Sequence, residues 1–434
     1  MPVQIVKIYA REASPRLLYI AGIILGDLLG ISWEIETDRR KTGKSPVINY
    51  SDDEIAGFKV KPCNLLYEKG ISNQQIDVTV WNNMPVFFQT AENADLPFDI
   101  FSASFFLVSR YEEYLSHEPD EHGRFRASSS IASKNGFLGL PLVDLWVKEF
   151  ASMLIRKFPE LVFRRNEFSA LTTIDSDQPF AYLGKRLLYS FGGMLRDVTR
   201  KEGSVAQRLK VVNGAMKDPF DVYDYICGAI DKNHSDARFF FPTGNHSKYD
   251  KNPSWKSEEY RDLIGKIQGK YRIGIHPSYY AGGKLSILRS ENARLKKITG
   301  SEISAGRYHF IRLRVPEGYN NMIEAGISED YSMGYPDEPG FRTSLARPCF
   351  FYNIREERQT TLRLIPFQVM DGTLTKYKNL SPHDAGKVII SLIDETRRAG
   401  GLFVSIWHNT TLLDTSEGRE WREIFEQMLK EQQS

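Results

Sequence analysis

From about residue 161 to its C-terminal end, the sequence alternates short apolar segments typical of strands with longer segments of helical periodicity. The expected strands cover residues 169–174, 237–241, 271–275, 309–315, 348–354, 362–370 and 402–407. The expected helices cover residues 219–232, 257–269, 319–325, 382–399 and 417–432. Because parallel neighbouring strands need long crossover connections, this order predicts an α/β fold built on a mostly parallel sheet or barrel.

The N-terminal region lacks this alternation. Residues 17–29 are expected to form a helix packed on this region, and the polar cluster at 109–113 is interpreted as a solvated helix face. The chain has 434 residues, enough for two domains at roughly 100–200 residues each. The charged, proline-containing segment 156–167 is the expected boundary. We therefore predict a smaller α/β domain over residues 1–160 and a larger domain over 161–434.

Composition limits the partners and the cellular compartment that we expect for the protein. The 57 basic and 55 acidic side chains nearly cancel, so we expect no nucleic-acid partner. Three widely separated cysteines, an odd number, are typical of a reducing compartment. The apolar run 17–31 contains Asp27 and is shorter than the roughly 20 residues that a spanning helix needs. We predict a cytoplasmic protein without a transmembrane segment.

Side chains that can bind a metal ion or transfer protons follow four of the expected strands. They are Asp175, Asp177, His276, Asp371 and His408. Each alone has a simpler explanation, since a strand-end aspartate often caps the next helix and a histidine often lies in the core. Together they would meet on one face, because the carboxyl ends of parallel strands converge, and unpaired buried charge there would be costly. The pattern therefore indicates a functional site.

Metal-assisted hydrolysis suits this set of side chains. A carboxylate and imidazoles can bind a divalent cation, which lowers the pKa of a bound water toward about 7. A second carboxylate can take the proton of the attacking water, and a histidine opposite can protonate the leaving group. Asp175 and Asp177, separated by one residue, could divide the roles of base and ligand.

Four segments together resemble the polysaccharide deacetylase superfamily (NodB homology, carbohydrate esterase 4). They are TTIDSD at 172–177, GIHPSYY at 274–280, GISEDYSMGYPDEPGFR at 326–342 and VSIWHNTTL at 404–412. The stretch FDIFSASFFLVSRYEEYL at 98–115 is similar to one in a bacterial branch with an additional N-terminal domain. The resemblance implies a distorted (β/α) barrel that removes acetyl groups from a glycan with a divalent metal.

The resemblance also implies roles for individual residues. Asp175 matches the catalytic base, and Asp177 and His276 match metal ligands. His408 matches the histidine that assists the leaving group.

An arginine orients the base in many members of the superfamily. Arg342 matches it, with Arg307 and Arg312 as alternatives. Asp330 matches an aspartate of the fourth region. The residues that we expect to contact substrate are Tyr280, Asp330, Tyr331, Asp371 and Trp407.

Two positions depart from the family pattern. Ser176 separates two aspartates that are normally adjacent, and Tyr280 stands where a second metal-binding histidine is normal. A metal site therefore needs a third ligand from elsewhere. His309 is the first candidate and His246 the second. Zinc is the expected metal, with nickel, cobalt or manganese as alternatives.

The predicted function is metal-dependent removal of acetyl groups from a glycan or sugar intermediate in surface polysaccharide metabolism. One alternative is hydrolysis of a C–N bond in a small non-sugar amide. Another is a non-catalytic carbohydrate-binding protein with a degenerate barrel, an idea motivated by Tyr280.

Overall fold

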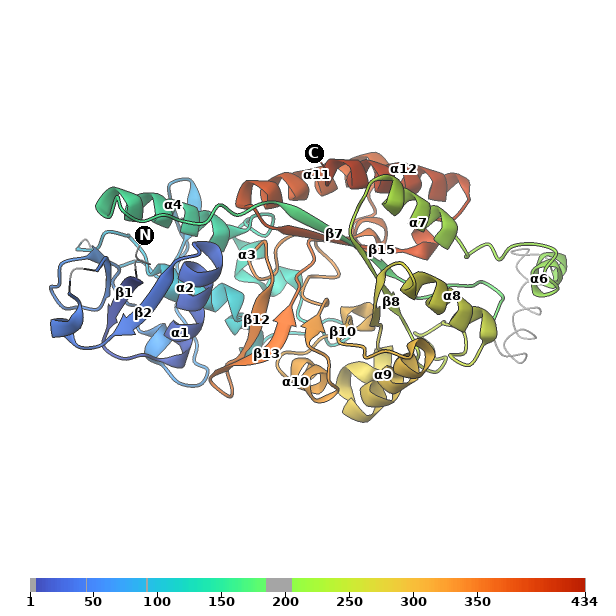
Figure 1. Cartoon of the computed structure of the whole chain (residues 1–434), viewed down its shortest axis with the longest axis horizontal. Coiled ribbons are helices and arrows are strands. Elements are labelled where there is room, and N and C mark those ends of the chain that lie inside the picture. Colours follow the sequence, from blue (N-terminus) through green and yellow to red (C-terminus); the bar gives the residue numbers. More distant parts are fainter. Residues whose placement is uncertain (1–4, 44, 91–92, 185–204, 434) are drawn as a thin grey trace.

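The computed structural model describes residues 5–43, 45–90, 93–184 and 205–433, and a nine-stranded sheet is its largest feature (Figure 1). In order across the sheet the strands are β12 (Cys349–Asn353), β13 (Arg358–Leu364), β11 (Glu329–Asp330), β10 (Ala305–Gly306), β9 (Arg272–Ile275), β8 (Ala237–Phe241), β7 (Ser169–Asp175), β15 (Leu402–His408) and β14 (Val369–Met370). All neighbours are parallel except β12 with β13. No ladder among the described strands joins the edges β12 and β14. The structure thus has the expected parallel α/β sheet, without a closed barrel.

Helices lie between several consecutive strands of this sheet, and one more follows its last strand. They are α6 (Val205–Val212), α7 (Tyr223–Lys232), α8 (Glu258–Gln268), α9 (Leu285–Thr299), α10 (Glu317–Glu324), α11 (Pro382–Ala399) and α12 (Ser416–Glu431). Figure 1 shows α11 and α12 lying side by side next to β15. Within the described part of the chain, no helix has the length and apolar character needed to cross a membrane.

The N-terminal region contains its own small sheet, with the order β2 (Ser32–Glu36), β1 (Ile5–Ala10), β3 (Val47–Tyr50) and β4 (Phe58–Lys59), all parallel. The helix expected over 17–29 is present as α1 (Pro15–Ala21) followed by the π-helix η1 (Gly22–Leu28). A hairpin of β5 (Thr79–Trp81) and β6 (Met84–Val86) precedes the remaining helices. These are α2 (Ile100–Val108), α3 (Ile131–Lys134) and α4 (Leu142–Lys157).

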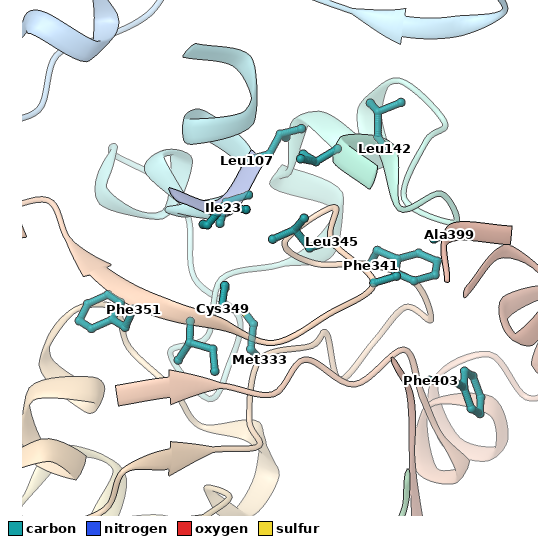
Figure 2. Packing of buried hydrophobic residues seen from close by; sticks show 14 of the residues in the cluster. Ile23, Leu107, Leu142, Met333, Phe341, Leu345, Cys349, Phe351, Ala399 and Phe403 are labelled. Carbon is teal, nitrogen blue, oxygen red and sulfur yellow. The ribbon is translucent and has the colours of Figure 1, made fainter. Parts of the chain in front are cut away.

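One hydrophobic core runs through both regions. Figure 2 shows Ile23 of η1, Leu107 of α2 and Leu142 of α4 packed in one cluster with residues from beyond position 330, such as Phe341 and Leu345. A smaller cluster lies on the other face of the large sheet, because successive strand residues alternate between faces. The division into domains at residue 160 stays a prediction, and the two regions share buried surface across it.

The cluster at 109–113 is not the solvated helix face that we expected. Arg110, Glu112 and Glu113 are at most 9% exposed. Arg110 donates to Glu112 and Glu113. Arg342, which lies in the segment between β11 and β12, donates two hydrogen bonds to Glu113. The polar residues are buried because this ion network joins the N-terminal region to the rest of the chain.

Two expected strands differ in the structure. Residues 309–315 form a single 3-10 turn (His309–Ile311) and a loop, and the strand in this region is β10, two residues long. The apolar pattern there resembles a strand, but the backbone is left-handed at Phe310. The strand expected over 362–370 is interrupted between β13 and β14, where Pro366 cannot donate a ladder hydrogen bond.

Strand register brings the ends of the central strands to one edge. His408 of β15 is the direct partner of Asp175 in β7, and Gly306 of β10 is the partner of Ile275 in β9. His276 and Arg307, the residues after this second pair, therefore lie at the same edge as the first pair.

Candidate functional site

Local sequence positions the site at the ends of β7 and β9. Asp175 ends β7 and Asp177 lies in the bend that follows, and both side chains line the same cavity although the buried Ser176 separates them. Adjacent aspartates are therefore not needed to bring two carboxylates together. In β9, Gly274 allows close packing, because a Cβ there would lie 2.5 Å from the ring of Phe240.

Three potential metal ligands are grouped at this edge. One ligand atom each from Asp177, His276 and His309 lies within 4.8 Å of the others. His276 Nε2 is 3.0 Å from Asp177 Oδ1, and His309 Nε2 is 3.3 Å from Asp177 Oδ2. Asp177 Oδ1 and His276 Nε2 are buried, and although they lie 3.0 Å apart, neither forms a hydrogen bond with the other or with any other described residue.

These orphaned atoms fit a divalent cation. Two imidazoles and one carboxylate are ligands that zinc accepts, and a buried polar atom without a partner is costly unless something binds it. Burial raises the pKa of Asp177, but His309, His408 and His276 outweigh burial and keep this pKa well below its ordinary value. The carboxylate is thus ionised and able to bind a cation.

Asp175 lies beside the group and is held by Arg307. Arg307 Nη1 donates to Asp175 Oδ1 at 2.7 Å, and Arg307 Nε donates to the Tyr331 carbonyl at 2.9 Å. The guanidinium is fully buried and lies over the Phe240 ring. Asp175 Oδ2 is 4.0 Å from His276 Nε2 and faces the group.

His408 lies on the other side of Asp177. Its Nε2 is 3.5 Å from Asp177 Oδ2, and its Nδ1 is 2.6 Å from Asp371 Oδ1. Asp371 Oδ2 also accepts a hydrogen bond from the His408 backbone N–H at 2.8 Å. Burial lowers the pKa of His408, but Asp371 and Asp177 outweigh burial and raise it to about 9. These two carboxylates therefore favour the protonated form of the imidazole.

His309 is supported by a second carboxylate. Its Nδ1 is 2.9 Å from Asp250 Oδ1, which also accepts from the Tyr279 backbone N–H at 2.9 Å. Asp250 Oδ2 accepts from Ser247 Oγ at 2.5 Å. Asp250 is 2% exposed, so its carboxylate is shielded from solvent. A carboxylate on one ring nitrogen fixes the tautomer in which the other nitrogen can bind metal.

One cavity of about 130 Å³ connects these groups. Its polar wall consists of Asp175, Asp177, His276, His309 and His408. Its apolar wall consists of Tyr308, Phe310, Ile311, Pro336 and Met370. Gly372, Lys376 and Tyr377 complete the wall together with Arg124, which comes from the N-terminal region.

The structure puts Arg307, rather than Arg342, on Asp175. Arg342 donates to Glu113 and to the Gly334 carbonyl and is buried in the ion network described above. Arg312 donates to the carbonyls of His122 and Tyr279. The expectation that Arg342 orients the base is therefore not met, because its guanidinium is engaged at the contact between the two regions.

None of the five residues expected to contact substrate lines the cavity. Trp407 is 1% exposed and packs on Trp421 and Phe425 of α12, on the face of β15 opposite His408. Tyr331 and Asp330 are also buried, so neither can stack on a sugar or bind one.

Tyr280 is exposed and lines a separate cavity of about 420 Å³. His246, the second candidate for the third ligand, lines that same separate cavity. Asp371, the fifth expected contact, is 1% exposed and lies behind His408.

Sequence reasoning missed Asp250 and Arg124. Asp250 lies in the loop after β8, and its position after a central strand was a usable signal. Arg124 had no signal, because nothing in a sequence shows which residue of a distant region reaches a cavity.

Comparisons with known proteins cover both regions. Residues 6–159 match a family of unknown function, DUF7033. No curated protein matches the chain in sequence. A candidate polysaccharide deacetylase from Mycobacterium smegmatis is similar in structure, at 13% identity and a TM-score of 0.40, over 62% of this chain and 86% of the other.

A carbohydrate esterase 4 family pseudoenzyme from Bacillus anthracis is similar over 62% of each chain, at 10% identity and a TM-score of 0.31. A 4-alpha-glucanotransferase from Thermococcus litoralis is similar over 62% of this chain and 37% of the other, at 12% identity and a TM-score of 0.32.

Proposed function

We propose that the protein is a metal-dependent hydrolase that removes acetyl groups from a glycan or sugar intermediate. One observation carries the proposal: the group of Asp177, His276 and His309 shares its cavity with Asp175 and His408. A ligand set, a candidate base and a candidate acid are thus within reach of one small substrate group. The sequence motifs that resemble the polysaccharide deacetylases contain four of these five residues.

Asp177, His276 and His309 would bind the divalent cation, with zinc as the first candidate. The cation would polarise the acyl carbonyl and lower the pKa of water at the site. Asp175, the second carboxylate of the cavity, would accept the proton of the attacking water. Arg307 would hold the Asp175 carboxylate in place through its bond to Oδ1 and leave Oδ2 facing the cavity.

His408 would protonate the leaving nitrogen or oxygen from Nε2. Asp371 lies 2.6 Å from Nδ1 and favours the protonated imidazole, the form that a general acid requires. Asp175 and His408 are register partners on adjacent strands, so base and acid face the substrate from neighbouring positions.

The cavity supports a small acyl group as the reacting part. About 130 Å³ with an apolar wall of Ile311, Pro336 and Met370 suits an acetyl methyl group better than a whole sugar ring. The sugar would then lie at the mouth, near the exposed side chains of Lys376 and Tyr377. The proposal includes the cytoplasmic setting and the role in surface polysaccharide metabolism that we predicted from the sequence.

The decisive experiment combines metal content with acetate release. Protein purified without chelator should contain about one zinc per chain, and His276→Ala should lose it. The zinc protein should release acetate from a member of a panel of N- and O-acetylated sugars, and Asp175→Asn should release none while keeping its fold and its zinc.

Each alternative function has its own signature in the same assay. With small primary amides added to the panel, release of ammonia without release of acetate from the sugars would favour hydrolysis of a small non-sugar amide. A folded wild-type chain that binds sugars, takes up no zinc or cobalt and releases nothing would favour a non-catalytic binding protein. Full activity of Asp175→Asn would exclude Asp175 as the base.

A further inference from the structure

The turn that contains His309 has an unfavourable backbone. Phe310 has a φ of 61° and Ile311 a φ of 52°, both in the left-handed region. This region is uncommon for any residue with a side chain, and it is an outlier for a β-branched residue such as Ile311. Such a conformation persists only when surrounding contacts fix it, and it is frequent at functional sites. We call residues 309–311 the His309 turn.

A second turn, from the N-terminal region, is packed against it. Residues 120–124 form a tight turn in which Asp120 Oδ1 accepts from the backbone N–H groups of His122 and Arg124. Asp120 Oδ2 accepts from Arg124 Nε at 2.6 Å. Asp120 therefore fixes the Arg124 side chain within its own turn, and this side chain is only 4% exposed. We call residues 120–124 the Arg124 turn.

Two hydrogen bonds connect the Arg124 turn to the His309 turn and to Arg312, the residue that follows it. Arg124 Nη1 donates to the Phe310 carbonyl at 2.7 Å. Arg312 Nε donates to the His122 carbonyl at 3.1 Å. The first bond goes directly to a left-handed residue, and that residue follows His309 in the chain. Arg124 also donates from Nη2 to Tyr377 Oη at 3.1 Å, on the wall of the cavity.

We propose that the N-terminal region serves the metal site through this contact, with Arg124 as a positioning residue for His309. Without Arg124, the Phe310 carbonyl would lose its buried partner and the His309 turn could relax to an ordinary backbone. His309 Nε2 would then leave its position 3.3 Å from Asp177. The inference rests on the proposed metal site, and it gives a role to the region that matches DUF7033.

The test compares Arg124→Met with Arg126→Met in the full chain. Arg126 is two residues further along, exposed, and bonded only to the Pro119 carbonyl in the described structure, so it is a matched control. Zinc affinity is measured by competition with a chelator, and the visible spectrum of the cobalt-substituted protein reports the ligands. We expect Arg124→Met to bind zinc about 10- to 100-fold more weakly, with an altered cobalt spectrum, and Arg126→Met to match the wild type.

A second readout needs no metal. The backbone N–H groups of His309, Ile311 and Arg312 donate within or near the His309 turn, to the carbonyls of Pro277, Tyr308 and His309. Hydrogen exchange at these amides should be faster in metal-free Arg124→Met than in Arg126→Met. If Arg124→Met does not fold, Arg124→Lys keeps a cation beside Asp120 and is judged by the same criteria.

The outcomes separate this inference from the proposed function. Zinc affinity and amide exchange that stay at wild-type values in Arg124→Met would overturn the positioning role, even if the variant melts at a lower temperature. A wild-type chain with no affinity for zinc or cobalt would overturn the proposed metal site and this inference with it.

Discussion

Two histidines of the site are oriented in the same way. His309 and His408 each face a buried carboxylate with Nδ1, provided by Asp250 and Asp371, and each turns Nε2 toward Asp177. The histidines that the two carboxylates support nonetheless have different proposed roles. Asp250 supports a proposed metal ligand, whereas Asp371 supports a proposed proton donor, so substitution of each should affect a different step.

Replacing Asp371 by Asn should impair turnover and leave metal binding intact. The amide removes the charge that helps keep His408 protonated, and it can present an N–H to Nδ1 and stabilise the wrong tautomer. We expect kcat for acetate release to fall about 10²- to 10⁴-fold, with an unchanged zinc content. Wild-type turnover in Asp371→Asn would argue against His408 as the acid.

Replacing Asp250 by Asn should have the reverse effect. His309 would lose the carboxylate on Nδ1, and we expect zinc to bind about 10- to 100-fold more weakly, as measured by calorimetric titration. Lys251→Met is the matched control, because the adjacent Lys251 donates only to the Ser247 carbonyl in the described structure. Equal zinc affinities in the two variants would mean that Asp250 does not support a ligand.

At the residue scale, the sequence predicted the positions of the short Asp and His side chains of the site better than the identity of the arginine that contacts Asp175. Asp175, His276 and His408 directly follow or end strands, so their positions follow from strand order and register. An arginine reaches several ångströms from its backbone, and the sequence could not distinguish Arg307 from Arg342. Arg342 is engaged by Glu113, a contact across 229 residues that no local pattern reveals.

At the scale of elements, the long helices were predictable and the shortest strands were not. α11 has its own start and stop signals, which are Ser381 as N-cap, Pro382 at the first position and left-handed Gly400 at its end. β10, β11 and β14 have two residues each, too few for any periodicity. They are strands only because neighbouring strands provide hydrogen-bond partners.

The two ends of α11 should contribute unequally to stability. Ser381 Oγ accepts from the Asp384 backbone N–H, and we expect Ser381→Ala to lower the free energy of unfolding by about 1 kcal/mol. Gly400→Ala should cost more, because φ is 66° and a Cβ would lie 2.5 Å from the Asn166 carbonyl oxygen. Urea unfolding monitored by circular dichroism measures both, and a smaller loss for Gly400→Ala would contradict this description of the helix end.

At the scale of the whole molecule, the ion network of Arg110, Glu113 and Arg342 connects the two regions. Burial raises the pKa of Glu113, but Arg342 and Arg110 outweigh burial and lower it to about 2. The ordinary value for glutamate in an unfolded chain is near 4.5. The network therefore contributes its full stabilisation above pH 4.5 and loses it progressively as the pH falls toward 2.

Glu113→Gln should reveal this contribution. It leaves two buried guanidinium groups without their shared carboxylate, and we expect a loss of about 3–5 kcal/mol at neutral pH. The variant should also lose less stability than the wild type between pH 4.5 and 2, as measured by thermal unfolding across that range. Glu395→Gln, which disrupts the surface pair with Arg398, is the control and should cost at most about 1 kcal/mol. Parallel pH profiles for Glu113→Gln and the wild type would contradict the assignment.

The pairing of Asp175 with His408 also bears on how this molecule could change over evolution. These residues face each other across the ladder between β7 and β15, so backbone hydrogen bonds set their spacing. Lys376 and Tyr377, which line the cavity, belong to the short π-helix η8 (Thr373–Tyr377), which can change without moving that ladder. Selection could therefore exchange one substrate for another by altering the rim, while the distance between the proposed base and acid stays constant.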